Sequence, residues 1–216
     1  MGGDHLVRAM LDGDWDIVAG QAFEKLRATE HQLEPFEPPE NWLKFGSLDW
    51  GSSAPFSFGL WCVANGDGLP NGLWLPRGAI VRFDEWYGWT GKPNEGQRLE
   101  VGDVAKGIKA KIGATKVSYI AADPSMWKVD GGKSHAETML GYGVVLRKAD
   151  NSRFAGYLSV RDRIAGDGDG KPMLYATKNC HAGFWRTMPN IIMDDRHVED
   201  VDTDQEDHAY DDVRYA

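Results

Sequence analysis

The chain has 216 residues, 42% of them hydrophobic and 26% charged, which fits one globular domain and excludes wholesale disorder. No apolar run approaches the roughly 18 residues that a bilayer-spanning helix needs, so we expect no membrane partner. The net charge of −9 is carried by residues 194–212, which hold ten acidic side chains and one arginine, so the balanced remainder lacks the basic excess of a generic nucleic-acid binder.

The first 44 residues are expected to form an appendage or linker. Apolar residues between Leu6 and Leu11 have helical spacing, but the polar stretch that follows ends at Pro38-Pro39, which cannot continue a helix. The alternation of residue types that is typical of strands begins at Phe45. We therefore place one folded domain at residues 45–216.

Three strands with short connections open this domain and indicate an antiparallel meander. They are expected at Phe45–Gly51, Phe58–Ala64 and Ala79–Tyr87. Helices and short strands then alternate, which predicts an α/β fold with a mixed sheet flanked by helices. The expected helices are 101–112, 134–141, 154–164, 182–188 and 206–216, and the further strands are 117–122, 144–146 and, at a sheet edge, 173–176.

Several short motifs resemble known binding or catalytic motifs but lack residues that those motifs require. The Gly-Gly-Lys-Ser run at 131–134 lacks the earlier glycine of a phosphate-binding loop, and the Asp-Gly-Asp-Gly run at 167–170 lacks the downstream glutamate of a calcium loop. Cys62 and Cys180 have no C-x-x-C or zinc-ligand spacing, and neither lies in a nucleophile motif. We expect a reducing compartment and a reaction without a side-chain nucleophile.

Three aspartates stand where a cation site could form. Asp49 ends the first strand and Asp123 ends the strand 117–122, each on an apolar face, while Asp211 shares a face of the last helix with His208. Carboxylates on apolar faces are costly to bury unless they are paired, protonated or bound to metal. Spacing alone leaves two interpretations open: turn acids with a solvated charge run, or ligands of a cation.

Four blocks of the sequence together resemble the C-terminal nuclease domain of the large terminase subunit of tailed bacteriophages. The block at 11–16 (Leu-Asp-Gly-Asp-Trp-Asp) is similar to the linker that follows the family's ATPase domain. The blocks at 48–51 (Leu-Asp-Trp-Gly), 122–125 (Ala-Asp-Pro-Ser) and 208–216 (His-Ala-Tyr-Asp-Asp-Val-Arg-Tyr-Ala) are similar to its three active-site motifs. The resemblance covers nearly the whole chain.

The resemblance implies a ribonuclease-H-like fold and a metal-dependent endonuclease that cuts concatemeric double-stranded viral DNA during packaging. It implies metal ligands at Asp49, Asp123 and Asp211, a further ligand at Asp212, and an orienting role for His208. Carboxylate oxygens suit two Mg²⁺ or Mn²⁺ ions, which can activate a water and stabilise the leaving oxygen when about 4 Å apart. It also implies an ATPase domain in the same polypeptide, a small terminase subunit and a portal as partners, and action in the host cytoplasm.

DNA contact requires cations, and the candidates surround the expected site in sequence. They are Lys128, Lys133, Arg147, Lys148 and Arg153, with Arg161, Arg163, Lys178 and Arg186 as further basic residues. A body without excess positive charge implies weak DNA affinity for this domain alone. Two other functions stay open: a stand-alone ribonuclease-H-like nuclease or resolvase, and a non-catalytic module that docks on portal or DNA.

Overall fold

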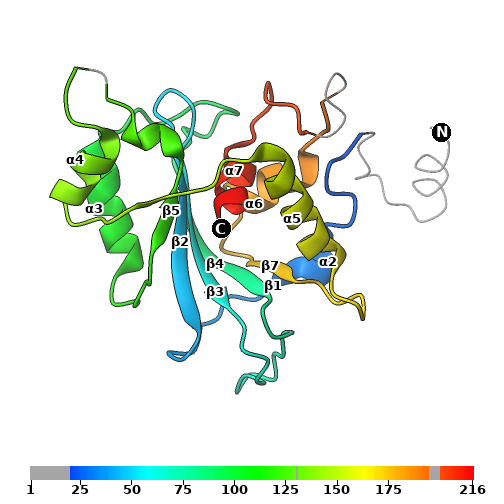
Figure 1. Ribbon diagram of the computed structural model, residues 1–216. Helices are drawn as coiled ribbons and strands as arrows, with labels where there is room; N and C mark the ends of the chain where they lie inside the picture. The colour runs from blue at the N-terminus through cyan, green and yellow to red at the C-terminus, as the bar shows by residue number, and fades with distance from the viewer. Residues whose placement is uncertain (1–19, 130, 195–199) are drawn as a thin grey trace.

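A mixed β-sheet between two layers of helices forms the molecule (Figure 1). The computed structural model describes residues 20–129, 131–194 and 200–216. The sheet has seven strands in the order β1-β7-β4-β3-β2-β5-β6. β3 runs antiparallel to β2 and β4, and the other neighbouring strands pair in parallel.

The elements alternate along the chain as the sequence pattern predicts. The strands are β1 (Gln32–Leu33), β2 (Leu43–Asp49), β3 (Ser57–Val63), β4 (Ile80–Tyr87), β5 (Ile120–Ala122), β6 (Arg147–Lys148) and β7 (Leu174–Thr177). The α-helices are α2 (Ala28–His31), α3 (Val101–Ile112), α4 (His135–Gly141), α5 (Arg153–Ala165), α6 (Phe184–Thr187) and α7 (His208–Tyr215). Two 3₁₀ turns, η1 (Pro124–Trp127) and η2 (Met188–Asn190), complete the set.

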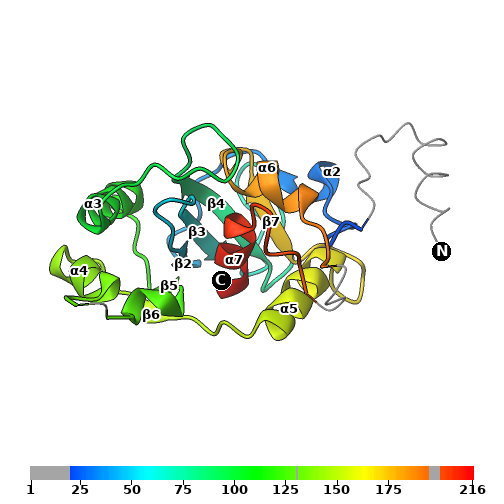
Figure 2. The ribbon, with the colours of Figure 1, turned by 90° about the horizontal axis from the view of Figure 1, so that it is seen from above.

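Each face of the sheet has its own hydrophobic core. Seen from above, α3 and α4 lie on one side of the sheet and α5, α6 and α7 on the other (Figure 2). Side chains of β2 alternate between these sides, because successive residues of a strand point to opposite faces. Phe45 packs in the core on the α5–α7 side and Leu48 in the core on the α3–α4 side. Asp49 is four residues after Phe45 and therefore points to the same face, so its carboxylate lies on the α7 side.

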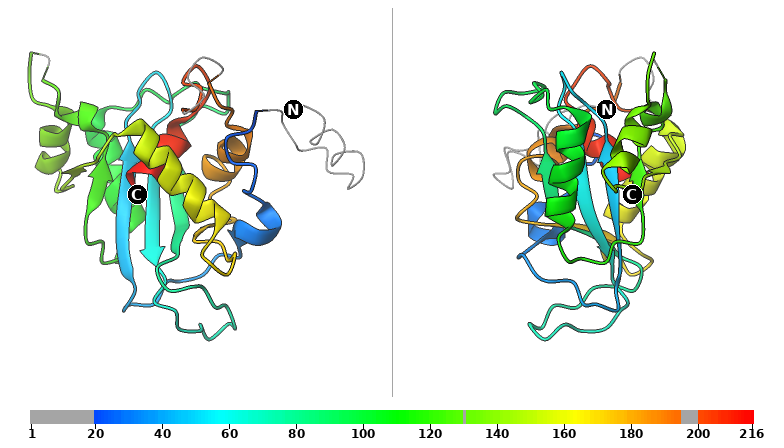
Figure 3. Two further views of the ribbon diagram at one scale, coloured as in Figure 1. Left: turned by 45° about the vertical axis from the view of Figure 1, so that its right-hand side comes forward. Right: turned by 90° about the vertical axis from the view of Figure 1, so that its left-hand side faces the viewer.

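The last helix, α7, packs directly on the centre of the sheet. Ala209, Tyr210 and Val213 are buried, and their spacing gives the helix an apolar stripe. α7 contacts β2, β3 and β5, and Figure 3 shows it (red) lying across the sheet. The helix therefore brings its polar residues against the carboxyl ends of β2 and β5.

The expected meander and the expected helices are confirmed, with three differences in the minor strands. The strand expected at 117–122 is shorter and spans Ile120–Ala122. The strand expected at 144–146 lies at 147–148, because Val144 is drawn into the core beside α4 rather than into the sheet. β7 is not an edge strand as expected, because β1 pairs with its outer side. No helix in the described ranges is long and apolar enough to cross a membrane.

The segment expected to be a linker is packed on the domain over the part that the structure describes. Ala22, Phe23 and Leu26 belong to the core on the α5–α7 side, and β1 adds a strand to the sheet. The helical spacing at 6–11 lies outside the described residues.

Candidate active site

Two aspartates meet at the carboxyl edge of the sheet because β2 and β5 are parallel neighbours. Leu48 pairs with Ala122, and the backbone N–H of Asp123 donates to the carbonyl of Leu48 at 2.9 Å. Asp49 follows Leu48 and Asp123 follows Ala122, so the two acidic residues end adjacent strands at the same level. The sequence placed each acid at the end of a strand, and the structure adds that these two strands are neighbours.

A third carboxylate, Asp211, reaches this edge from α7. Its negative charge raises the pKa of Asp49 more than the charge of any other neighbouring residue does, which places the two carboxylates in one electrostatic environment. Burial raises the pKa of Tyr215, and the charges of Asp211, Asp49 and Asp123 raise it further. The Tyr215 ring thus shares the surroundings of all three acids. The structure brings together the three aspartates that the sequence singled out.

The sequence analysis missed two residues on this face of α7. Asp207, Asp211 and Tyr215 follow one another at intervals of four residues, so they line one side of the helix. Asp207 is buried, and burial together with the charge of Asp211 raises its pKa to about 6. The same four-residue spacing, applied to Asp211 in both directions, would have found them.

The cluster carries more negative charge than its protein surroundings balance. Asp49 is buried, and burial raises its pKa well above the usual value, with Asp211, Asp123, Asp212 and Asp207 raising it further. An ionised carboxylate among others in a buried site is disfavoured unless a cation joins it. The electrostatics of Asp49 therefore favour either a shared proton or a bound cation.

Specific contacts orient each of the three acids. Asp123 accepts from the backbone N–H of Ser125 at 2.8 Å and from the hydroxyl of the same residue. Asp211 accepts from Arg214 at 2.8 Å. His208 Nδ1 lies 3.3 Å from Asp49 Oδ2, and its Nε2 lies 2.9 Å from Asn94 Oδ1. Because both contacts of the histidine are to oxygens, both are hydrogen bonds only when the ring is protonated.

Asp212 lies on a different side of α7 from Asp211 and is fully buried. Arg82 of β4 forms an ion pair with it at 2.6 Å, and Ser57 donates a hydrogen bond at 2.7 Å. Burial raises the pKa of Asp212 to about 6, with Arg82, Ser47 and Ser57 opposing the change. Asp212 therefore joins α7 to the sheet, and Asp211 is the member of the pair that faces Asp49.

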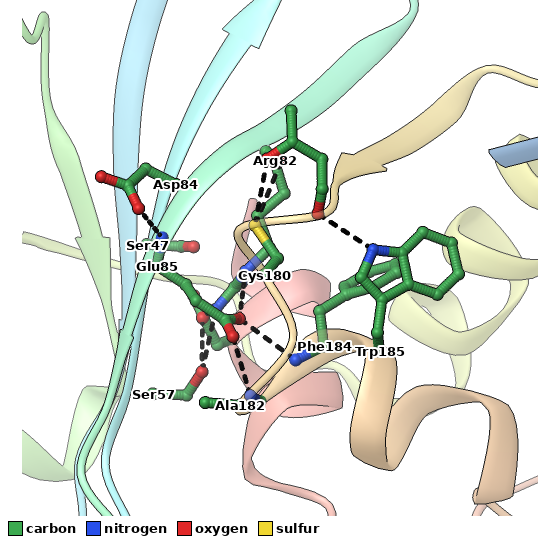
Figure 4. Close-up of polar contacts among 12 residues, drawn as sticks. Ser47, Ser57, Arg82, Asp84, Glu85, Cys180, Ala182, Phe184 and Trp185 are labelled. Carbon is green, nitrogen blue, oxygen red and sulfur yellow. Dashed lines mark hydrogen bonds and ion pairs between the residues drawn. The ribbon is translucent and has the colours of Figure 1, made fainter. Parts of the chain in front are cut away.

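Arg82 is the centre of a buried polar network that connects three elements (Figure 4). Its side chain also lies 3.2 Å from Glu85, whose carboxylate accepts the backbone N–H groups of Gly183 and Phe184 at 2.8 and 3.1 Å. Burial opposes charge on Arg82, but Asp212 and Glu85 outweigh it and raise its pKa. The sequence analysis did not predict this network, although a charged residue among the apolar residues of β4, Arg82, could have indicated it.

The basic residues fall into two groups. Lys128, Lys133, Arg147 and Lys148 are exposed and form no ion pair within the described ranges. The others are bound elsewhere: Arg153 to Asp200, Arg161 to Asp162, Arg163 to the Gly78 carbonyl, Lys178 to Glu34 and Arg186 to Glu206. Among these candidates, the first group and Arg163, whose partner is a neutral carbonyl, keep a positive charge that no carboxylate balances.

The donor set at the carboxyl edge fits a hard divalent cation. Asp49, Asp123 and Asp211 offer carboxylate oxygens without a thiol, the ligand type that Mg²⁺ and Mn²⁺ prefer. Within the described residues, however, no three acidic, histidine or cysteine side chains converge closely enough to hold one ion. The ligand type and the unbalanced charge of these three aspartates fit a metal ion, whereas their spacing in this structure is too wide to hold one.

Comparison with known proteins identifies the fold. No protein-family model and no curated protein sequence matches the chain. Among solved structures it is similar to the large terminase of a thermophilic bacteriophage in complex with ADP, with 19% identity and a TM-score of 0.69 over 91% of this chain and 44% of that one. The chain thus spans less than half of that terminase.

Two separate nuclease domains match over most of their own length. The P22 large terminase nuclease domain is 14% identical, with a TM-score of 0.66 over 91% of this chain and 90% of that one. The large terminase nuclease from the thermophilic phage G20c, solved with bound cobalt, is 12% identical, with a TM-score of 0.58 over 93% of this chain and 97% of that one. The chain therefore has the ribonuclease-H-like fold of the nuclease domains of phage large terminases.

Proposed function

We propose that this chain is the nuclease domain of a phage large terminase, a metal-dependent endonuclease that cuts concatemeric double-stranded DNA during genome packaging by two-metal-ion phosphodiester hydrolysis. The observation that carries the proposal is the meeting of Asp49, Asp123 and Asp211 at one edge of a sheet with this fold. A buried group of like charges is expensive to maintain, and it persists most readily where a cation and a phosphate are bound.

Asp49 and Asp123 present carboxylates from adjacent strand ends, and Asp211 closes the site from α7. We assign the third ligand to Asp211 because Asp212 is already bound to Arg82 and Ser57. Mg²⁺ or Mn²⁺ held by these oxygens supplies activation of water and neutralisation of the charge that develops on the phosphate. The G20c nuclease was solved with bound cobalt, which supports the use of a divalent cation by this chain.

The remaining residues of the site act by orientation. Ser125 holds the carboxylate of Asp123 and Arg214 holds that of Asp211, so each acid keeps one direction before a cation arrives. His208 lies against Asp49 and Asn94, and a hydrogen bond from its Nδ1–H fixes the Asp49 carboxylate. No hydroxyl or thiol nucleophile is required, because water attacks the phosphate in this reaction.

The proposed partners are those of a full-length large terminase, of which this chain matches one part. The ADP-bound terminase is more than twice as long as the part of it that this chain matches. We propose that an ATPase domain of the same polypeptide, a small terminase subunit and a portal position the DNA in the host cytoplasm. The balanced charge outside 194–212 supports a dependence on such partners, because the isolated domain has little electrostatic affinity for DNA.

Cleavage of a supercoiled plasmid at low salt tests the proposal. The wild-type chain is expected to nick and linearise the plasmid with Mn²⁺ or Mg²⁺ and not with EDTA. Asp123→Asn is expected to lower the rate by about 10³-fold or more, since it removes a charged ligand. Asp103→Asn is the matched control, because Asp103 is exposed on α3 and pairs only with Lys106.

Each result has a distinct meaning. Equal loss in both variants would point to general damage, and equal activity in Asp123→Asn and the wild type would overturn the site. Absence of cleavage with every metal, together with absence of metal binding in a titration, would favour the non-catalytic docking module.

A further inference from the structure

Four exposed basic residues that form no ion pair within the described ranges lie in the segments that follow Asp123. Arg147 and Lys148 form β6, Lys128 follows η1, and Lys133 precedes α4. β6 lies beyond β5, on the side of Asp123 that is remote from β3 and β4. Arg147 and Lys148 therefore lie on one flank of the acidic site.

Arg147 lies on the same face of the sheet as the three acids. It pairs with Ala121 of β5, and paired residues of parallel strands point to the same face. Ala121 and Asp123 are two residues apart and share that face. The Arg147 guanidinium lies 5.1 Å from the centre of the Tyr119 ring, which belongs to the same row. Arg147 therefore lies on the acid-bearing face of the β5–β6 edge, and its guanidinium extends toward Tyr119.

Lys148 occupies the neighbouring position on the other face. It pairs with Ala122, the residue before Asp123, and its ammonium lies 5.7 Å from the centre of the Trp127 ring in η1. An aromatic ring holds a cation in place without cancelling its charge, whereas a carboxylate does both. Arg147 and Lys148 are thus positioned and still free to meet an anion.

The segment that leads into α7 is acidic. Asp202 and Asp204 lie in it, and Asp207 is its last residue. Arg153 of α5 is bound to Asp200 of this segment at 2.6 Å. A polyanion is repelled from this segment and attracted to the exposed cations of β6.

We infer that the phosphate backbone of double-stranded DNA reaches the three aspartates across the β5–β6 edge, with Arg147 and Lys148 contacting phosphates along this edge, away from the cleaved bond. The inference rests on the proposed function, and it removes Arg153, Arg161, Arg163, Lys178 and Arg186 from the candidate contacts. Phosphate contacts of this kind position the duplex and carry no sequence information.

The test compares two double variants that remove the same charge. Arg147→Gln/Lys148→Gln removes the proposed contacts. Arg77→Gln/Lys171→Gln is matched to it, since Arg77 is exposed without an ion pair in the described residues and Lys171 lies over Trp74 at 4.4 Å. Lys171 precedes β7, so it lies at the end of the sheet opposite to the acids. Both proteins are titrated with a short fluorescent duplex in Ca²⁺ at several salt concentrations, and their plasmid cleavage is measured in Mn²⁺.

The first variant is expected to lower the slope of log affinity against log salt by about 2, because each phosphate contact contributes about 0.9. Raising salt from about 50 to about 200 mM then costs the wild type about tenfold more affinity than it costs this variant. Its KM rises while kcat stays within about twofold, since the three acids are intact. The matched variant behaves as the wild type.

The outcomes separate this inference from the proposed function. If both double variants lose affinity equally, or if Arg147→Gln/Lys148→Gln keeps the wild-type salt slope, the β5–β6 edge is not the DNA path, although metal-dependent cleavage stands. A wild-type chain that neither binds nor cleaves DNA overturns both.

Discussion

The two adjacent aspartates of α7 face different surroundings. Asp212 points into the sheet, where Arg82 lies 2.6 Å away and Ser57 donates a hydrogen bond. Asp211 faces the edge of the sheet, where the nearest charged groups include Asp49 and its only cationic contact in the described residues is Arg214 of the same helix. Although the two residues are consecutive, Asp212 has a buried cationic partner, whereas Asp211 belongs to a cluster of like charges.

The two aspartates therefore belong to two groups of charged residues: one holds the fold together and the other forms the candidate site. The charges of Arg82, Asp212 and Glu85 connect β4, α7 and the first residues of α6. This network fixes where α7 lies, and so where Asp211 is presented to Asp49. The edge cluster, formed by Asp49, Asp123, Asp207 and Asp211, works against folding until a cation is bound, because its members repel one another around the buried carboxylate of Asp49.

Removing the central cation of the network should have the largest effect. Arg82→Met is expected to lower the free energy of unfolding by about 3–5 kcal/mol, because Asp212 and Glu85 then remain buried without their partner. Urea unfolding followed by tryptophan fluorescence measures the change. Arg82→Met/Asp212→Leu should recover part of the loss, since the double change also removes an unpaired charge. A loss below about 1 kcal/mol in Arg82→Met would mean that the network does not hold α7 in place.

The buried aspartates of the edge cluster and of the Arg82 network should make stability depend on pH in the absence of divalent cations. Asp49, Asp207 and Asp212 have pKa values raised above those of the unfolded chain, the latter two to about 6. An acid with a raised folded-state pKa favours folding below its unfolded pKa and loses that contribution as pH rises through the folded value. The free energy of unfolding is therefore expected to fall from about pH 4 to about pH 7.

The variant Asp49→Asn isolates the contribution of the cluster. Because it removes one of the repelling charges, it should be more stable than the wild type at pH 7 by about 1–2 kcal/mol and should flatten the pH dependence. Mn²⁺ should raise the melting temperature of the wild type and leave that of Asp49→Asn nearly unchanged. A wild-type stability that is independent of both pH and Mn²⁺ would contradict the cluster as a cation site.

The sequence predicted the strand-end acids because their placement depends on local rules. Asp49 and Asp123 each terminate an apolar strand, and parallel pairing of those strands is enough to bring them together. The choice between Asp211 and Asp212 could not be made from sequence, since both adjoin buried residues of α7. It depends on Arg82, which lies on a strand far away in the chain.

Features that depend on distant pairings were missed for the same reason. β1 has two residues, too few for a periodic pattern, and it exists only because β7 offers an open edge. Whether a basic residue forms an ion pair also depends on residues far away in the sequence. Lys178 pairs with Glu34, 144 positions away, whereas Arg147 and Lys148 contact aromatic rings and form no ion pair in the described residues. Composition around these residues does not distinguish the two cases.

The smallest predicted effect concerns His208, the histidine that touches the edge cluster and not the network. His208→Gln is expected to weaken Mn²⁺ affinity and cleavage by about tenfold with little change in stability, because residues that orient a ligand contribute on this scale. Isothermal titration with Mn²⁺ measures the first quantity. His181→Gln is the control, since His181 is exposed and outside the cluster.

A second variant tests whether His208 acts through orientation. Its Nε2 lies 2.9 Å from Asn94 Oδ1, so Asn94→Ala releases the ring without altering it. If the ring orients Asp49, Asn94→Ala reproduces much of the loss, and the double variant His208→Gln/Asn94→Ala is no worse than His208→Gln. Additive losses would instead mean that His208 and Asn94 contribute separately, and that the contact of 3.3 Å between His208 and Asp49 does not hold the carboxylate in position.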